Sequence, residues 1–478
     1  MAVNFILNGQ RRAEDVRATM TVLEWLRTSA RLTGTKEGCA EGDCGACTIL
    51  IARPSDGGAP RWQVANACLM VMGQLDGCAV MTIEAVAPDG RLSDAQQALL
   101  GADATQCGFC TPGVVLTMTA LQQDGGKPGT EAIHTALSGN LCRCTGYRSI
   151  VDACRDLPAA QPAVPDDLPA PAAEHRGATG ETYLAPATLH DLLALRARHP
   201  DAVLLAGGTD LGLQITKGDE RWPLTIATGG VAALRKVEER DDAVVIGGAA
   251  TYSAALPALA RRIPAFAALV RRIGSPQIRN LGTFAGNLAT ASPIGDTLPC
   301  LIALDARVKL ASVRGSRTLA ADAFVTGYHT TVLAADEIIE RIEIPVPAAA
   351  ARVAAYKLSK RFDLDISTVI AAFHVVDGGL RAAFGGMGDR ATRAGALERA
   401  WASGKIFDLP LAAIEALLVE DFPLLGDDQG DELHRRRTRG SRFYRRQAAA
   451  GLVRRFILEG DGQDSGAGAR APLTLEAL

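Results

Sequence analysis

The sequence lacks the features that would indicate a membrane, an exported or a nucleic-acid-binding protein. No apolar run reaches the roughly 18 residues that a bilayer-spanning helix needs, and the start, MAVNFILNGQRR, lacks the basic-then-apolar order of a secretory signal. The 50 basic and 53 acidic residues nearly cancel, and neither sign dominates any large segment. Balanced charge argues against nucleic acid as the main partner. We therefore expect a cytoplasmic, globular protein that binds neither membrane nor nucleic acid.

Cysteine is nearly absent from the last two thirds of the chain, where Cys300 stands alone. The other ten of the 11 cysteines lie within the first 154 of the 478 residues. Because a reducing cytosol disfavours disulfides, this crowding indicates metal ligands or redox groups rather than cross-links. The total length corresponds to roughly three domains of about 150 residues each.

The cysteine-rich third divides into two predicted units, residues 1–77 and 78–156. The first is predicted to be a small α+β domain built around a glycine-rich loop at 34–48. Its expected elements are strands at Val3–Leu7, Thr48–Ala52 and Trp62–Met70, a turn at Asn8-Gly9 and a helix near Thr21–Ala30. The second carries four short helical patterns joined by cysteine-bearing loops, which predicts a compact helical bundle.

The remainder of the chain begins with a stretch rich in Ala and Pro at 157–178. This composition predicts an extended, fairly stiff linker that separates the cysteine-rich third from the rest. Residues 179–349 and 350–460 mix short strand patterns with helices, and 461–478 are predicted to form a disordered tail. The whole is thus expected to be an α+β multidomain protein.

Nine arginines lie between Arg435 and Arg455. Phe443, Ala448, Leu452 and Phe456 mark one apolar face of a helix through this stretch. We interpret it as an amphipathic terminal helix with a solvated basic side rather than as a nucleic-acid-binding segment.

Cys39, Cys44, Cys47 and Cys68 form a C-x4-C-x2-C pattern with a fourth cysteine 21 positions further on. This is the ligand spacing of a plant-type [2Fe-2S] ferredoxin. Glycines in the loop allow backbone N–H groups to turn toward the sulfurs and offset the cluster's negative charge. The alternative is a structural zinc site, which usually shows two C-x2-C knuckles instead.

Cys107, Cys110, Cys142 and Cys144 form a second set, C-x2-C and C-x-C separated by 31 residues. Alone, the C-x2-C pair would also suit a thioredoxin-like redox motif. Together the two pairs supply four more ligands, which helix ends could bring together. The spare cysteines, Cys78, Cys154 and Cys300, lie in apolar surroundings and are predicted to be buried, inert thiols.

The segments KEGCAEGDCGACT, ANAC, QCGFCTPG and GNLCRCTGY resemble the two-cluster iron–sulfur region of molybdenum hydroxylases. LLAGGTDLG at 204–212 and GTFAGNLATASPIGD at 282–296 resemble the flavin-binding loops of the same family. Both regions in one chain are similar to the small subunit of bacterial xanthine dehydrogenases, and the resemblance covers about residues 3–455. It implies a β-grasp ferredoxin-like domain, a helical [2Fe-2S] domain, and a non-Rossmann FAD-binding domain with an α+β C-terminal domain.

The resemblance implies that FAD is held by residues of these two loops and by three positions elsewhere. They are Leu204, Leu205, Ala206, Gly207, Gly208, Thr209, Asp210, Leu211, Ile273, Thr283, Gly286, Asn287, Ser292, Asp296, Ile339 and Lys357. Two consecutive glycines let backbone N–H groups face a pyrophosphate. Asp296 would accept from ribitol or ribose hydroxyls, and Lys357 would favour the anionic reduced isoalloxazine. Two positions depart from the family pattern: Ala285 replaces a common glycine, and Ile273 replaces a common aromatic.

The resemblance also implies groups that meet other molecules. Gln106 and Cys144 match contacts to a molybdopterin cofactor bound by another subunit. Tyr328, Asp363 and Asp365 match the border of a nicotinamide site, although the last two also suit a solvated charged loop.

We therefore expect the small subunit of an NAD+-dependent xanthine dehydrogenase, assembled with a large molybdopterin-binding subunit as a heterotetramer of two small and two large chains. Electrons would pass from the molybdenum centre through two [2Fe-2S] clusters to FAD and then NAD+. No residue of this chain would perform the hydroxylation. Other hypotheses are the same subunit in an aldehyde- or N-heterocycle-oxidising enzyme, a stand-alone flavin and iron–sulfur reductase, or a zinc-bearing scaffold.

Overall fold

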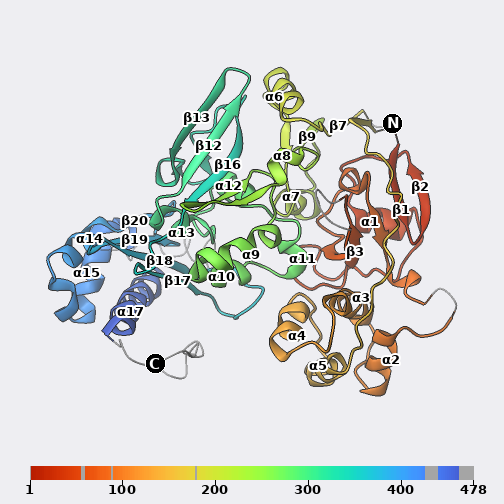
Figure 1. Ribbon diagram of the computed structural model, residues 1–478, viewed down its shortest axis with the longest axis horizontal. Coiled ribbons are helices and arrows are strands. Elements are labelled where there is room, and N and C mark those ends of the chain that lie inside the picture. Colours follow the sequence, from red (N-terminus) through yellow and green to blue (C-terminus); the bar gives the residue numbers. More distant parts are fainter. Residues whose placement is uncertain (1, 55–59, 88–89, 178–179, 426–439, 462–478) are drawn as a thin grey trace.

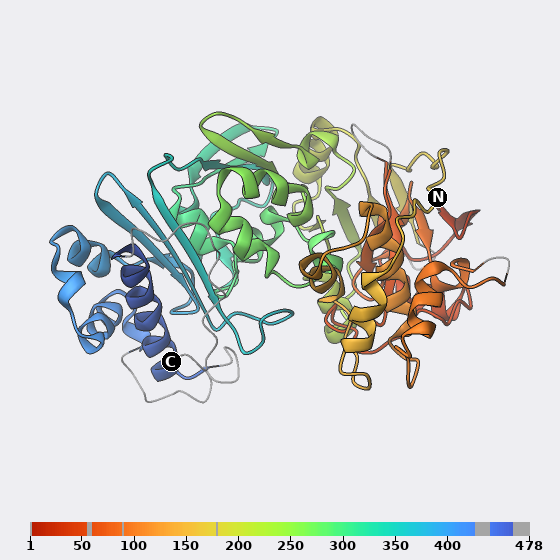
Figure 2. The same ribbon diagram turned by 60° about the horizontal axis from the view of Figure 1, so that its bottom comes forward.

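The computed structural model shows an elongated molecule whose cysteine-rich part and C-terminal part lie at opposite ends, with the middle of the chain between them (Figures 1 and 2). It describes residues 2–54, 60–87, 90–177, 180–425 and 440–461. The predicted tail at 461–478 therefore lies almost wholly outside the described residues. Mixed helices and sheets confirm the predicted α+β organisation. In the part of the chain described, none of the helices combines the length and apolarity required to cross a bilayer.

The first unit is a five-stranded sheet with the order β2-β1-β5-β3-β4, in which β1 and β5 run parallel. Helix α1, Val22–Thr28, packs on the sheet, with Trp25 fully buried against Phe5. The strands are β1 Val3–Leu7, β2 Gln10–Glu14, β3 Thr48–Ala52, β4 Gln63–Asn66 and β5 Ala79–Met81. Since β5 lies past residue 77, the unit extends beyond its predicted end.

The predicted strand Trp62–Met70 is too long, because β4 ends at Asn66. After Asn66 the chain turns back on itself: Leu69 and Met70 both donate their backbone N–H groups to the Asn66 carbonyl at 3.2 Å. The turn brings Cys68 beside Cys47. This contact is between distant parts of the chain, so the local alternation of apolar residues could not predict where the strand ends.

The second unit is a helical bundle, as predicted. It comprises α2 Asp94–Gly101, α3 Thr111–Leu121, α4 Thr130–Leu137 and α5 Arg148–Arg155. Helix α3 forms its centre and is buried along most of its length, because the apolar run from Val114 to Leu116 also meets β3 of the first unit.

The middle of the chain contains two sheets. One is β6-β7-β9-β8, in which β7, β9 and β8 run parallel, and the other is the antiparallel sheet β10-β11-β16-β12-β13. Their strands are β6 Glu174–Arg176, β7 Thr182–Leu184, β8 Val203–Leu205, β9 Leu224–Ala227, β10 Val237–Glu239, β11 Ala243–Gly247, β12 Arg307–Ser312, β13 Gly315–Ala320 and β16 Ile338–Pro345, with a small hairpin β14 Val325–Gly327 and β15 Thr330–Thr331. The helices are α6 Leu189–Arg198, α7 Leu211–Gly218, α8 Ala232–Arg235, α9 Tyr252–Arg262, α10 Pro264–Arg271, α11 Pro276–Arg279, α12 Phe284–Thr290 and α13 Leu298–Ala303.

The C-terminal unit packs helices against one face of the antiparallel sheet β17-β18-β19-β20. Its elements are β17 Arg352–Leu358, β18 Val369–Val376, β19 Gly379–Gly385, β20 Thr392–Arg393, α14 Gly395–Ala402, α15 Leu411–Asp421 and α17 Arg442–Asp461. The predicted terminal helix exists, and Phe456, Ala448 and Leu452 of its predicted apolar face pack on the C-terminal core. Phe443 does not, because it is 50% exposed, and Arg445 is fully buried instead. The Arg445 Nη1 donates to the carbonyls of Thr368 and Gly386, which anchors the start of the helix on the sheet.

The Ala/Pro-rich stretch is extended, but it does not act as a spacer between separate parts. Trp62 Nε1 donates to the Ala163 carbonyl at 3.3 Å, and Ala172 N–H donates to Asp76 at 2.5 Å. Val164 and Leu168 pack against the first two units. The cysteine-rich units also contact the middle of the chain directly, for example through Asn280 Nδ2, which donates to the carbonyl of Val64 at 2.9 Å.

Candidate functional site

The loop of the first cysteine set directs backbone donors at one sulfur. The N–H groups of Glu41, Asp43 and Cys44 point to the Cys39 Sγ at 3.4, 3.4 and 3.3 Å. Gly42, with φ of +79°, makes this turn without strain. A hydrogen bond from the Cys44 thiol and these backbone donors lower the pKa of Cys39 to about 5. The loop therefore stabilises negative charge on sulfur.

The other two thiols of this set, Cys47 and Cys68, are buried and also contact each other. A hydrogen bond to the Cys47 sulfur and burial together raise the pKa of Cys68. Cys47 Sγ lies 3.7 Å from Asn66 Oδ1, and the Nδ2 of the same Asn66 amide donates to the Gly42 carbonyl at 2.8 Å. The four thiols thus form two pairs joined by one hydrogen-bonded loop.

The second set forms pairs across the ends of its helices. Cys107 lies against Cys144, and the N–H of Phe109 and the Cys144 thiol lower the pKa of Cys107. Cys110 lies against Cys142. Burial of the Cys110 thiol and, to a lesser extent, its hydrogen bond with Cys142 raise the pKa of Cys110 to about 12. Cys107 and Cys144 are exposed, which brings one edge of the set to the surface.

Pairs of thiols fit the chemistry of a [2Fe-2S] cluster, in which two irons share four cysteine ligands. Within the described ranges, no three His, Cys, Asp or Glu side chains gather as they would around a single metal ion. Backbone donors near Cys39 match a group that carries negative charge. The spare cysteines are buried as predicted, and burial raises the pKa of Cys78 to about 11 and that of Cys154 to about 12. Burial also raises the pKa of Cys300.

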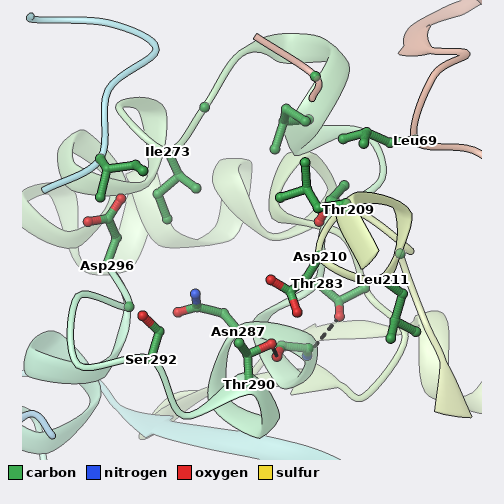
Figure 3. Close-up of a pocket in the computed structure, with 18 of the residues that line it drawn as sticks. Leu69, Thr209, Asp210, Leu211, Ile273, Thr283, Asn287, Thr290, Ser292 and Asp296 are labelled. Carbon is green, nitrogen blue, oxygen red and sulfur yellow. Dashed lines mark hydrogen bonds between the residues drawn. The ribbon is translucent and has the colours of Figure 1, made fainter. Parts of the chain in front are cut away.

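A cavity of about 670 Å³ lies between the first cysteine loop and the two glycine-containing loops of the middle region. Figure 3 shows Thr209, Asp210 and Leu211 on one side of this space, and Asn287, Ser292 and Asp296 on the other. Leu69, which follows Cys68 in the chain, also faces it. Loops far apart in the sequence therefore enclose one space.

Three glycines make the first of these loops possible. A Cβ at position 207 would lie 2.1 Å from the Leu281 carbonyl oxygen, and one at position 212 would lie 2.6 Å from the Leu69 carbonyl oxygen. Gly208, with φ of +78°, completes the turn from β8 into α7. The second loop is set by Thr283, which caps α12 by accepting the Gly286 N–H at 2.9 Å. Asn287 Oδ1 accepts from the Thr297 hydroxyl at 2.6 Å, which fixes its amide.

The cavity gathers most of the residues predicted to bind FAD. Those that line it are Leu204, Ala206, Gly207, Gly208, Thr209, Asp210, Leu211, Ile273, Thr283, Gly286, Asn287, Ser292, Asp296 and Lys357. Leu205 and Ile339 do not line it, so the cavity gives no support to these two assignments. Both side chains are in hydrophobic clusters, because alternate residues of a strand face opposite sides and Leu204 takes the cavity side of β8.

Asp296 and Lys357, which both line the cavity, form an ion pair with each other. Lys357 Nζ donates to Asp296 Oδ2 at 2.7 Å and to the Arg272 carbonyl at 2.9 Å, and its side chain is only 1% exposed. Ser367 Oγ donates to the other carboxylate oxygen. The pair therefore presents a nearly neutral, hydrogen-bonded wall, and this modifies the separate roles expected for the two residues.

The residues predicted for the nicotinamide side do not converge on one point. Asp365 lines the cavity, but its carboxylate accepts the backbone N–H groups of Arg361 at 2.9 Å and Ile366 at 3.0 Å. Asp363 is half-buried outside the lining. Tyr328 is exposed on the β14–β15 turn, and its neighbour His329 reaches the cavity instead.

Sequence reasoning missed several lining residues that come from other elements. They are Glu41, Gly42, Asp43, Leu69, Tyr252, His329, Leu364 and Ser367. The first four flank ligand cysteines, so their chemistry was visible but their proximity to the flavin loops was not. Burial raises the pKa of Asp210, and the nearby His329 acts in the opposite direction. Nothing in the sequence indicated that Asp210 and His329 lie close together.

Comparison with known protein families assigns a type to each unit. Residues 5–73 match a 2Fe-2S iron-sulfur cluster binding domain, and residues 82–155 match a [2Fe-2S] binding domain. Residues 177–347 match the FAD binding domain in molybdopterin dehydrogenase, and residues 354–460 match the CO dehydrogenase flavoprotein C-terminal domain. The chain has the iron–sulfur and flavin domains of the molybdenum hydroxylases. The predicted β-grasp, helical, flavin-binding and C-terminal domains are thereby confirmed.

Individual molybdenum hydroxylases are similar over most of this chain. A xanthine dehydrogenase of Drosophila pseudoobscura pseudoobscura is 31% identical, covering 80% of the chain and 34% of the relative. Aldehyde oxidase 2 of Cavia porcellus is also 31% identical, covering 71% of the chain and 31% of the relative. The chain thus spans about a third of the length of these relatives.

Among solved structures, carbon monoxide dehydrogenase from Hydrogenophaga pseudoflava lacking the Mo-pyranopterin moiety is similar, with a TM-score of 0.50 and 28% identity. The match covers 57% of this chain and 94% of that one. Reconstituted CO dehydrogenase from Oligotropha carboxidovorans matches with a TM-score of 0.50 and 25% identity, covering 59% of this chain and 98% of that one.

Proposed function

We propose that this chain is the iron–sulfur and flavin subunit of a xanthine dehydrogenase-like enzyme. Bound to it, two [2Fe-2S] clusters and FAD would carry electrons from a molybdopterin centre on a large partner subunit to NAD+. The assembly would contain two small and two large subunits, and hydroxylation of the substrate would take place entirely on the large one. The similarity to xanthine dehydrogenases supports the assignment.

This proposal rests mainly on the cavity that the first cysteine loop shares with the two flavin loops. Gly42 and Asp43, from between Cys39 and Cys44, line the same space as the two flavin loops, and so does Leu69 beside Cys68. A flavin held there would therefore touch the loop that holds the first thiol set. This adjacency is what a relay between an iron–sulfur cluster and a flavin requires.

Residues of the cavity have separate parts in holding the flavin. The backbone at Gly207 and Gly208 would face the pyrophosphate, since no side chain blocks that approach. The paired Asp296 and Lys357 would form a hydrogen-bonding wall, with Ile273 as an apolar neighbour. Tyr328, Asp363 and Asp365 remain proposals for the nicotinamide border.

The second set would face the partner subunit. Cys107 and Cys144 are exposed, and the neighbouring Gln106 is also at the surface. We assign Gln106 and Cys144 as contacts to the partner's pterin, because an amide side chain offers both a donor and an acceptor to a heterocycle edge.

Expression with and without the partner tests this function. The chain alone should bleach its flavin with NADH yet leave xanthine unchanged, and xanthine oxidation should appear only with a co-purifying, molybdenum-containing large chain. Xanthine turnover by the isolated chain would contradict the proposal. Failure of any molybdenum-containing large chain to co-purify with this chain from its native host, while NADH still reduces the flavin, would favour a stand-alone reductase.

The similarity to an aldehyde oxidase makes aldehydes a second substrate class to test beside purines. The purified complex should therefore be assayed with xanthine, an aromatic aldehyde and an N-heterocycle under the same conditions. Faster turnover of either of the last two would assign the chain to an enzyme of that class while leaving the electron-transfer role intact.

A further inference from the structure

Helix α7 connects the flavin cavity to the first cysteine loop. Its N-terminal half lines the cavity through Leu211, Leu213 and Gln214. Its last turn lies on the cysteine loop, where Thr216 Oγ1 donates to the Ala40 carbonyl at 2.7 Å and Lys217 Nζ donates to the Cys39 carbonyl at 2.6 Å. One short helix therefore contacts both candidate cofactor sites.

The Lys217 ammonium brings a positive charge to Cys39, whose sulfur accepts three backbone N–H groups of the loop. Besides its bond to the Cys39 carbonyl, it lies 3.7 Å from the Glu41 carboxylate, and both side chains are 49% exposed. Lys217 Nζ lies closer to the Cys39 carbonyl than to this carboxylate, so Glu41 offsets its charge only in part. The Glu41 N–H in turn donates to the Cys39 sulfur.

We propose that Lys217 is a positioning residue that raises the reduction potential of the first cluster. This inference rests on the proposed cluster sites. Reduction adds one electron to a group that is already negative, and a fixed positive charge nearby stabilises the reduced form more than the oxidised form. A higher potential makes this cluster a better acceptor of electrons on their way to the flavin.

The effect should be confined to one of the two clusters. Lys217 contacts the loop at Cys39, whereas the second set reaches the same loop at Cys44, where the Leu141 N–H donates to the Cys44 carbonyl at 2.9 Å. Coulomb interactions weaken with distance, so the second cluster serves as an internal reference within each sample.

The test is a redox titration of the intact holoprotein followed by electron paramagnetic resonance, with the two signals assigned by Cys44→Ala and Cys110→Ala. Lys217→Met should shift the first-set potential to a lower value and leave the second-set potential unchanged. Lys217→Arg, which keeps the charge, should restore the wild-type value. Lys236→Met is the matched control, because Lys236 is an exposed lysine next to α8 in the same domain.

Three results would overturn the inference: no shift in Lys217→Met, equal shifts of both signals, or the same shift in Lys236→Met. Loss of the first cluster in both Lys217→Met and Lys217→Gln, with retention in Lys217→Arg, would assign Lys217 to cluster assembly and would also overturn it. Absence of both signals from the wild-type holoprotein would instead refute the proposed cluster sites.

Discussion

No cysteine of the first set is exposed and two are buried, whereas half of the second set reaches the surface. Cys47 and Cys68 are each 2% exposed, while Cys107 and Cys144 are open to solvent beside Phe109, which is 47% exposed. An enclosed site is insulated and can meet a flavin only through the protein around it. An open site can meet a group on another chain. The two sets therefore suit the inner and the outer positions of a relay.

The difference arises from what surrounds each loop. Three units meet at the first set: Asn140 of the helical unit donates to the Gly45 carbonyl at 3.4 Å, and Gln277 of the flavin unit donates to Thr48 and to Asn140, both at 3.2 Å. Gly45 packs so closely that a Cβ there would lie 2.0 Å from the Gly139 carbonyl oxygen. The second set has no comparable cover at Gly108, where a Cβ would meet nothing within 4 Å.

The largest effect should come from removing one ligand of each set. Wild-type protein should contain about four irons per chain, and Cys44→Ala or Cys110→Ala should each lower this to about two. Each variant should also lose a different one of the two paramagnetic signals of the reduced protein. Zinc in place of iron, or loss of both signals from a single replacement, would contradict the division into two sets.

Because Gly45 is closely packed and Gly108 is not, the same glycine-to-alanine replacement should cost more stability at Gly45 than at Gly108. Gly45 and Gly108 have φ of +68° and +81°, so alanine at either position costs about 1–2 kcal/mol of backbone strain. Gly45→Ala adds the clash with Gly139, for a total of about 3 kcal/mol or more. Denaturation of the holoproteins, followed by cluster absorbance, should show the larger loss for Gly45→Ala; equal losses would mean that the loop can relax.

The buried amide between the two sets should matter more than a hydrogen bond at the surface. Asn140 Oδ1 accepts from Thr117 at 2.8 Å and from Gln277 at 3.2 Å, so Asn140→Leu leaves buried donors unpaired at a cost of about 1–3 kcal/mol. Thr105→Val is the control. It removes the exposed 2.7 Å bond to Thr111 and should change the unfolding free energy by less than about 0.5 kcal/mol. A larger loss from the control would reverse the comparison.

The spare cysteines Cys78 and Cys154 should make the stability of the protein depend on pH in the same way. Burial raises the pKa of Cys78 to about 11 and that of Cys154 to about 12, from an ordinary value near 9. Between pH 9 and 11 the unfolded chain therefore loses these protons before the folded chain does, and stability falls as the pH rises. Cys78→Ala and Cys154→Ala should each reduce this fall by about 1 kcal/mol per pH unit in urea denaturation series. Unchanged slopes would show that other groups cause it.

Local patterns in the sequence predicted much of the secondary structure and the composition of the site. Strands β1 and β3 have the predicted bounds, because short apolar runs beside turn residues have few other structures open to them. Spacing alone singled out the eight predicted ligand cysteines, which the structure brings together in pairs, and fourteen of the sixteen predicted flavin residues line one cavity. Glycine-rich loops are recognisable in sequence because few other residues tolerate their backbone geometry.

Features that depend on distant contacts were missed or misplaced. Arg445 is buried because two backbone carbonyls accept its hydrogen bonds, although its neighbours suggested a solvated face. The predicted linker packs on the cysteine-rich part that it was expected to hold apart from the rest, because Trp62 and Asp76 offer partners to its backbone. The ion pair of Lys357 and Asp296 joins positions 61 residues apart, and periodicity carries no information about such pairs.

The sequence by itself determined which atoms are available: two sets of four thiols, two glycine-containing loops and a balanced surface. Spacing constrains these because ligands must reach one cluster and a backbone must turn without a side chain in the way. Only the tertiary structure decided that Leu69 and Asp43 share a cavity with the flavin loops and that Lys217 lies on Cys39. It also decided that the first set has no exposed thiol while the second has two. Such relations depend on how whole units pack, since burial and proximity are properties of surfaces brought together rather than of any single segment.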